Sequence, residues 1–406
     1  ATATTELFFF ANPDPFFGPR GAVLDQEPVT AKPIVLDNAP SATDAPDFAI
    51  LTEQGGVGFL ELLLAQQNGM FQPFAAKRQV GNHEIAAERN PRDLLVGDFD
   101  GDAVPDLFIV NEGEVGGVVH HVVSGQQRPG PPLGDVTMVR AAVGAVQGVT
   151  ALLDADTLPD ILLVPAPVQG GGSDVQVLLS RPLGHGQPSF LSVASIDFGD
   201  FAYEAMEVAD FDGDQILDVA MVSGSELKFG VAFGVGDGSF TPAQQFDIGD
   251  IPFYGSASPQ SQAVGLHSCQ NGDRPSLALV LSGFIGANPP TVAVLNQEFD
   301  LATQEWSFTS PDEGGVFVAP EFVEPFGKSL LENIDGIGEV ELVVAVAGEP
   351  TFVSGGVLQF DSVTRSFIAL DIENGTAVGT EVPVQVSALS FGKAFASDGL
   401  TGEKNA

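Results

Sequence analysis

One short pattern recurs along the whole chain: a usually acidic residue followed by a run of apolar residues, most of them β-branched or aliphatic. Such a run between turn residues is typical of a buried strand. The pattern occurs seven times, beginning at Glu6, Asp47, Asp106, Asp160, Asp218, Ser276 and Glu341. The spacings from the second copy onward are 54 to 65 residues, and 406 residues divided by seven gives 58. The chain is therefore expected to fold as a repeat.

A period near 58 residues, made of strands and Gly/Pro turns without a 3.6-residue periodicity, predicts propeller blades of four antiparallel strands. We expect a single all-β domain over residues 1–406, a seven-bladed β-propeller. A glycine-rich hairpin, GVGDGSF at 234–240 and looser copies at 67–71 and 184–190, indicates the outer strands. A strand at 384–391 is expected to pair with the N-terminal strand and to close the ring, which removes an exposed sheet edge.

Charge excludes two classes of partner. Lys and Arg total 15 against 54 Asp and Glu, a formal net charge of -39. A field of this sign repels nucleic acid and anionic membranes, and it attracts cations. We therefore expect no nucleic-acid partner.

Targeting features favour an extracellular or cell-surface protein. The single cysteine, Cys269, excludes an internal disulfide framework. No stretch reaches the roughly 18 apolar residues that span a bilayer, so membrane insertion is not expected. The opening ATATT resembles the remainder after signal-peptide removal, and the millimolar calcium outside cells suits aspartate-rich sites.

Two acidic loops are the strongest candidates for chemistry: DFDGDAVPD at residues 98–106 and DFDGDQILD at 210–218. Aspartates at loop positions 1, 3, 5 and 9 direct oxygens towards one centre, position 7 offers a carbonyl, and glycine permits the sharp turn. The predicted ligands are Asp98, Asp100, Asp102, Val104 and Asp106 in the first loop. In the second loop they are Asp210, Asp212, Asp214, Ile216 and Asp218.

Calcium is the predicted ion, with a structural role. It takes six to eight oxygens, whereas magnesium demands a stricter octahedron and retains more water. A solvated acidic turn is the alternative, but closely spaced aspartates repel one another without a cation. The loops are not EF-hands, because position 12 has no glutamate and strands flank the loop.

The corresponding segments of other repeats have lost acidic positions. Asn333, Asp335 and Glu341 retain oxygens at positions 1, 3 and 9, which makes a weaker third metal site. The segment 154–160 is interpreted as a loop two residues short. It is expected to be a turn without metal, as are 271–273 and 44–47.

These loops, each followed by an apolar strand, and the GxGDGxF hairpin resemble FG-GAP/VCBS repeats, found in the integrin α-subunit propeller and in many secreted bacterial proteins. The resemblance implies calcium loops between the first two strands of a blade, with the ligands named above. Ligand sites of that family have no motif that can be matched here. Fungal lectins with similar repeats bind sugars, but their sugar contacts cannot be transferred either.

The expected function is a binding or adhesion module for an extracellular protein or glycan. A lectin of the same architecture and a structural subunit of an extracellular assembly are the alternatives. No catalytic set is visible: the neighbouring His120 and His121 are interpreted as ordinary hairpin histidines, because adjacent strand residues point to opposite faces. The chain is therefore predicted not to be an enzyme.

Overall fold

The computed structural model describes the strands and the better-placed connections of the chain. The described residues are 5–9, 20–24, 28–34, 47–65, 71–81, 88–113, 118–125, 133–141, 144–165, 174–184, 187–193, 195–199, 203–223, 228–247, 263–271, 274–281, 291–300, 305–309, 316–318, 326–332, 341–346, 355–361 and 366–369. They form 28 strands and no α-helix. Among them, no helical segment is long and apolar enough to cross a membrane.

The first half of the chain forms a hairpin and three antiparallel sheets, which we number in chain order. The hairpin is β1 (Thr5–Phe9) with β2 (Arg20–Leu24). Sheet 1 contains β3 (Pro28–Ile34), β4 (Asp47–Gln54), β5 (Val57–Ala65) and β6 (Phe71–Val80). Sheet 2 contains β7 (Pro91–Gly97), β8 (Asp106–Asn111), β9 (Val118–Gly125) and β10 (Leu133–Ala141). Sheet 3 contains β11 (Ala145–Ala151), β12 (Asp160–Pro165), β13 (Asp174–Ser180), β14 (Phe190–Ser192) and β15 (Ile196–Asp197), the last paired with β13.

The second half repeats this order three times. Sheet 4 contains β16 (Ala205–Ala209), β17 (Asp218–Ser223), β18 (Lys228–Ala232) and β19 (Gln244–Asp247). Sheet 5 contains β20 (Ala263–Asn271), β21 (Arg274–Leu281), β22 (Thr291–Asp300), β23 (Glu305–Thr309) and β24 (Val316–Val318), the last paired with β22. Sheet 6 contains β25 (Phe326–Glu332), β26 (Glu341–Val346), β27 (Gly355–Asp361) and β28 (Ser366–Ala369).

The recurring apolar runs become the second strands of the sheets. Six of the seven predicted runs lie in β4, β8, β12, β17, β21 and β26. The first run, at Glu6, forms β1. All six residues of β8, of β12 and of β17 are buried. Continuous burial is expected where a strand has neighbouring sheets against both faces, and it explains why these runs do not alternate with polar residues.

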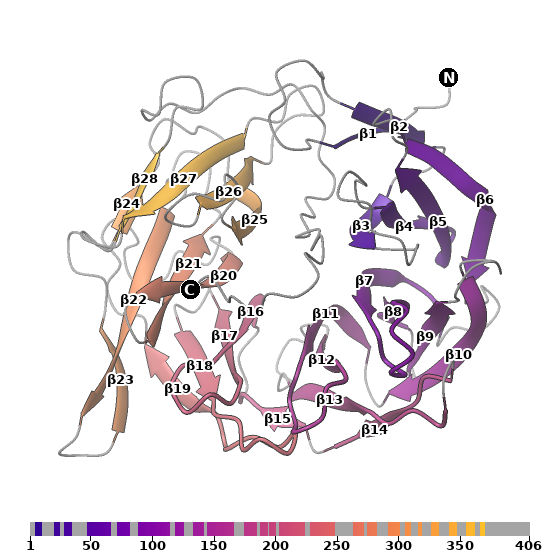
Figure 1. The fold of residues 1–406 in the computed structure, drawn as a ribbon. Helices are drawn as coiled ribbons and strands as arrows, with labels where there is room; N and C mark the ends of the chain where they lie inside the picture. Colours follow the sequence, from indigo (N-terminus) through magenta and orange to yellow (C-terminus); the bar gives the residue numbers. More distant parts are fainter. Residues whose placement is uncertain are drawn as a thin grey trace.

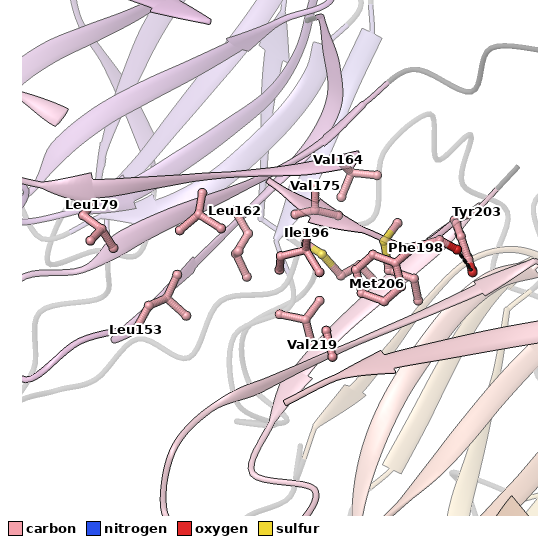
Figure 2. Packing of buried hydrophobic residues seen from close by; sticks show 13 residues of the cluster. Leu153, Leu162, Val164, Val175, Leu179, Ile196, Phe198, Tyr203, Met206 and Val219 are labelled. Atoms are coloured by element: carbon pink, nitrogen blue, oxygen red, sulfur yellow. Dashed lines mark hydrogen bonds between the residues drawn. The ribbon is translucent and has the colours of Figure 1, made fainter. Parts of the chain in front are cut away.

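Sheets 1 to 5 pack face to face in sequence order. One apolar cluster joins sheets 1 and 2, a second joins sheets 2 and 3, a third joins sheets 3 and 4, and a fourth joins sheets 4 and 5. Figure 2 shows the third cluster, in which Leu162 and Val175 of sheet 3 face Val219 of sheet 4. The first strands of successive sheets also touch, as β3 does with β7 and β7 with β11. Figure 1 shows the sheets following one another around a common centre.

The all-β class and the antiparallel four-stranded sheets are confirmed by this topology, although sheets 3 and 5 each carry a fifth strand. The N-terminal strand pairs with β2 in a two-stranded sheet, and β2 contacts β6 of sheet 1. The predicted closing strand at 384–391 lies outside the described residues. The described part of the molecule therefore contains sheets arranged in sequence order without a paired closure.

Candidate metal centre

The two acidic loops occupy the same place in sheets 2 and 4: each connects the first strand to the second. Register pairs Gly97 with Asp106 and Ala209 with Asp218, so both loops span the same number of residues. Backbone φ is positive at Gly101 (76°) and at Gly213 (84°), the fourth loop position. It is also positive at the sixth position, at Ala103 (65°) and Gln215 (72°). Glycine adopts this conformation without steric cost, and the two loops share one backbone path.

The first aspartate of each loop organises the turn. Asp98 Oδ1 accepts hydrogen bonds from the N–H groups of Gly101 (2.7 Å) and Asp102 (3.1 Å), and Oδ2 accepts one from Ala103 (2.8 Å). Asp210 makes the same three bonds, at 2.7, 3.1 and 2.9 Å. Both carboxylates therefore support the positive-φ residues directly.

The ninth-position aspartate connects its loop to the end of the third strand or to the residues just after it. Asp106 Oδ2 accepts from the Phe99 N–H (3.0 Å) and Oδ1 from the Gly125 N–H (2.8 Å). Asp218 does the same with Phe211 (2.7 Å) and Gly234 (2.8 Å). The glycines are needed for this approach: a Cβ at Gly125 would lie 2.3 Å from the Pro105 carbonyl oxygen, and one at Gly234 would lie 2.3 Å from that of Leu217.

Three carboxylates converge in each loop. One oxygen from each lies within 4.8 Å of the others in the set Asp98, Asp100 and Asp106, and likewise in the set Asp210, Asp212 and Asp218. Carboxylate oxygens are the ligands that hard divalent cations prefer, so both clusters are able to hold a metal ion. Two of the predicted carboxylate ligands, Asp102 and Asp214, lie outside the clusters. Asp102 Oδ1 accepts the Val104 N–H (2.8 Å) and Asp214 Oδ1 accepts the Ile216 N–H (2.7 Å).

Burial makes the ionised form of these clusters costly. Desolvation raises the pKa of Asp106 to about 7, aided by the charges of Asp100 and Asp102, while the N–H groups of Gly125 and Phe99 oppose the rise. Desolvation also raises the pKa of Asp218 to about 7, with Asp212 adding to it. A bound cation favours the ionised form and removes this cost.

The prediction that the 154–160 loop of sheet 3 is two residues short is wrong. Register pairs Ala151 with Asp160, as Gly97 pairs with Asp106, so Leu152 and Leu153 occupy the first two loop positions. Asp160 forms the same bonds as Asp106, to the N–H groups of Leu153 (3.0 Å) and Ser180 (2.8 Å). Sequence reasoning missed this because it searched for an acidic first position.

The remaining loops are described only at their ends. In sheet 6, Glu332 pairs with Glu341, which matches the register around the two acidic loops. Asn333 and Asp335 lie outside the described residues, as does the side chain of Glu341. In sheet 5, Asn271 pairs with Arg274, so its first two strands are joined by a two-residue connection. The turn proposed at 44–47 is described only at Asp47.

A buried polar network involves the two neighbouring histidines. Asn111 joins them: its N–H donates to His120 Nδ1 (3.0 Å), and its side-chain nitrogen lies 3.0 Å from His121 Nδ1. His121 Nε2 lies 3.5 Å from a Glu88 carboxylate oxygen. Burial lowers the pKa of His120 to about 3, so its imidazole is neutral. The sequence contained no signal for this network, because Glu88 and Asn111 are far from the histidines along the chain.

Comparisons with known proteins identify no family. No family model matches the chain, and no curated protein does. Two solved structures are similar over most of their length. Rhamnogalacturonan lyase YesW has a TM-score of 0.37 at 11% identity, covering 85% of this chain and 84% of that one. The Bacillus licheniformis rhamnogalacturonan lyase PL11 has a TM-score of 0.38 at 12% identity, covering 86% and 84%.

The prediction that the chain is not an enzyme is contradicted by these neighbours, both of which are lyases, and we do not retain it. A missing motif was a weak basis for that prediction, because catalytic groups on loops of different sheets have no fixed sequence spacing. Identities of 11% and 12% are too low to transfer an activity or a substrate to this chain.

Proposed function

We propose that the chain is a single domain, a calcium-stabilised, seven-bladed β-propeller. The end of this propeller that carries the loops between the first and second strands of the sheets binds an extracellular protein or glycan. Six successive sheets with the same order of their first four strands support the propeller, as do the apolar clusters that join sheets 1 to 5 face to face. The seventh blade in this proposal combines the N-terminal hairpin with the segment near 384–391. Blades closed in this way leave no long exposed edge.

The observation that carries the proposal is the repetition of one three-carboxylate cluster at one structural position in sheets 2 and 4. A chance acidic turn has no reason to recur with the same hydrogen bonds. Calcium fits better than magnesium because the loops offer carboxylates and carbonyls from a single tight turn, which suits a flexible shell of six to eight oxygens. Calcium at millimolar concentration outside cells supports the proposed extracellular or surface location.

Exposed apolar side chains support a recognition role for this end of the molecule. The Arg181–Asp156 ion pair places the β13–β14 connection beside the sheet 3 loop, and the Gly238 N–H donates to the Leu153 carbonyl (3.0 Å) from the β18–β19 connection. These three segments carry the exposed side chains Leu152 (52%), Leu183 (81%) and Val235 (54%). With acidic loops around them, they fit a partner surface that presents apolar and basic groups.

Calorimetric titration of calcium into chelated protein tests the metal proposal. We expect two ions per chain from the two loops and a higher melting temperature, because a ligand that binds only the folded state stabilises it. Asp100→Asn and Asp212→Asn should each remove one ion, while Asp135→Asn, an exposed aspartate in β10, should leave both. Unchanged stoichiometry in the two loop variants contradicts the assignment.

A glycan array, run with calcium and with chelator, separates the two proposed partner classes. Binding of sugars that is lost on chelation supports a glycan partner. If no sugar binds at high protein concentration, a protein partner remains, and crosslinking in an extracellular fraction then compares the wild type with the Leu183→Asp variant. The variant is expected to lose the crosslink. Equal crosslinking by the wild type and the variant contradicts a recognition role for the exposed apolar side chains.

A further inference from the structure

The sheet 3 loop has the same length as the two metal-loop candidates and shares part of their hydrogen bonding. Asp156 N–H donates to Asp154 Oδ1 (2.9 Å), and the Leu158 N–H donates to Asp156 Oδ1 (2.9 Å). The equivalent bonds in sheet 2 run from Asp102 to Asp100 and from Val104 to Asp102. The third, fifth and ninth positions therefore retain their aspartates and their local hydrogen bonds.

The first difference is the loss of the first-position carboxylate. Leu152 stands where Asp98 and Asp210 organise the other turns, and it is 52% exposed. The fourth position is Ala155 instead of glycine. Neither Ala155 nor Thr157 has a positive φ, unlike the fourth and sixth positions of the other loops. Among the described residues, the three-carboxylate convergence occurs in sheets 2 and 4 and is absent from this loop.

The second difference is a positive charge supplied by the chain. The Arg181 guanidinium pairs with Asp154 through Nη2 and with Asp156 through Nη1, the latter at 2.9 Å. Arg181 directly follows Ser180, whose N–H binds Asp160. In sheet 4 the residue after Gly234 is Val235, and in sheet 2 the residue after Gly125 is Gln126. Neither of these equivalents carries a charge.

The pKa shifts of Asp154 and Arg181 agree with a guanidinium that stabilises the loop. Although burial acts in the opposite direction, the hydrogen bond from Arg181, the Asp156 N–H and the positive charge together lower the pKa of Asp154. The hydrogen bond to Asp154 also raises the pKa of Arg181, with Asp156 and Asp160 adding to the rise. A planar guanidinium with fixed donors suits two neighbouring carboxylates better than a point charge does.

We infer that Arg181 is a built-in cation that replaces the metal ion in sheet 3, so this loop is held without metal while the loops of sheets 2 and 4 require it. The contrast with sheets 2 and 4 rests on the proposed calcium sites, whereas the role of Arg181 itself does not. It follows that the sheet 3 loop should bind a metal ion once Arg181 is removed and the missing loop residues are restored. It lacks the first-position carboxylate and the fourth-position glycine, and Arg181 pairs with the aspartates at its third and fifth positions.

The first test measures melting temperatures of Arg181→Met, Arg181→Lys and Asp98→Asn in calcium and in chelator. Arg181→Met should lower the melting temperature by at least about 2 °C, and by the same amount in both conditions. Arg181→Lys, which keeps the charge, should recover about half of the loss. Asp98→Asn should reduce the increase that calcium produces. An Arg181→Met protein as stable as the wild type, or destabilised only in calcium, overturns the inference.

The second test builds the missing site in the triple variant Leu152→Asp, Ala155→Gly, Arg181→Val, with Arg181→Val alone as the control. Titration of calcium should give one more ion per chain than the wild type for the triple variant and no additional ion for the control. Equal stoichiometry in all three proteins overturns the expected metal binding in the sheet 3 loop. If the wild type binds no calcium, the proposed function fails, and the chelator arm of the first test still decides the role of Arg181.

Discussion

At the scale of single residues, the acidic loops depend on hydrogen bonds to the backbone as well as on the carboxylates that could hold a metal ion. Asp106, Asp160 and Asp218 use both carboxylate oxygens to join the loop to the end of the third strand of the same sheet, or in sheet 4 to Gly234 just after it. This arrangement is the same in sheet 3, where Arg181 supplies the cation. The ninth-position aspartate is therefore primarily a structural connection, and its contribution to metal binding follows from its position.

Gly125→Ala should destabilise the protein by about 1–3 kcal/mol, because its Cβ would lie 2.3 Å from the Pro105 carbonyl oxygen and the strand would have to move. Gly184→Ala is the matched control: it lies in the β13–β14 connection, and a Cβ there meets no atom within 4 Å. Chemical denaturation of both variants measures the difference. Equal stability of the two variants would show that the close contact at Gly125 is unimportant.

His120 should make the protein sensitive to acid. Burial holds its pKa at about 3, below the ordinary 6.5, so it is neutral when folded and binds a proton when unfolded. The stability that neutral His120 contributes is therefore fully present above pH 6.5. It is lost as the pH falls towards the pKa of His120 in the folded protein, with a slope of about 1.4 kcal/mol per pH unit. Burial lowers the pKa of His267 to about 4, which acts in the same direction.

The test compares unfolding free energies of the wild type and His120→Phe from pH 7.5 to 5 in saturating calcium. The free energy of unfolding of the variant should be lower by a constant amount, because the Asn111 N–H loses its acceptor. It should also depend less steeply on pH than that of the wild type. Parallel curves for the two proteins would contradict protonation of His120 as a cause of acid sensitivity. A steeper wild-type curve supports it.

At the scale of elements, each acidic loop packs against the sheet that follows it. Phe99, the second residue of the sheet 2 loop, contacts Phe190 of β14 at a ring-centroid distance of 5.5 Å, and Phe190 also contacts Phe108 at 5.5 Å. In the next pair of sheets, Phe240 packs with the cluster that contains Leu153. The aromatic residue of the glycine-rich hairpin thus covers the loop of the preceding sheet.

Phe190→Ala should weaken calcium binding at the sheet 2 loop and leave the sheet 4 loop unchanged. Without the ring, Phe99 loses an edge-on contact and the loop is less well ordered before the ion binds, and the protein should also lose about 2–3 kcal/mol of stability. Calorimetry should separate one weakened site from one normal site. The exposed Leu191→Ala in the same strand is the control, and equal weakening of both sites would argue for a global effect.

The sequence predicted strands well because burial on both faces leaves an uninterrupted apolar run. The runs at Asp106, Asp160 and Asp218 begin β8, β12 and β17, and the loops before the first and last of these runs lie where they were expected. Contacts between distant segments were not predictable. Arg181 lies 27 residues from Asp154, and nothing local to either residue indicates the pair. The same is true of Glu88 and His121.

At the scale of the whole molecule, sheets packed in sequence order make each acidic loop part of an interface. The sheet 2 loop meets sheet 3 through Phe99, and Phe211 of the sheet 4 loop belongs to the apolar cluster shared with sheet 5. An ion bound in either loop therefore stabilises two sheets and their contact. By our inference Arg181 has this role in sheet 3, where it pairs with Asp154 and Asp156 of the loop.

Varying the salt concentration should distinguish the effect of the net charge on stability from the effect of the carboxylates in the two loops. A net charge of -39 opposes the compact state through repulsion over long distances. Screening lengths fall from about 30 Å at 0.01 M salt to about 8 Å at 0.15 M, which suppresses this repulsion. Oxygens within 4.8 Å of one another are closer than either length, so their repulsion persists. Sodium chloride should therefore raise the melting temperature, yet it should not replace calcium.

The measurement is the melting temperature at both salt concentrations, with millimolar calcium and with chelator. The melting temperature should rise with salt both in calcium and in chelator. The gap, which is the difference between these two melting temperatures, should shrink by less than half. Choline chloride in place of sodium chloride controls for sodium binding in the loops. A gap that closes at 0.15 M salt would mean that calcium acts on the overall charge, because only long-range repulsion is screened in that range. A persistent gap places its effect in the three-carboxylate clusters, where the structure brings the charges together.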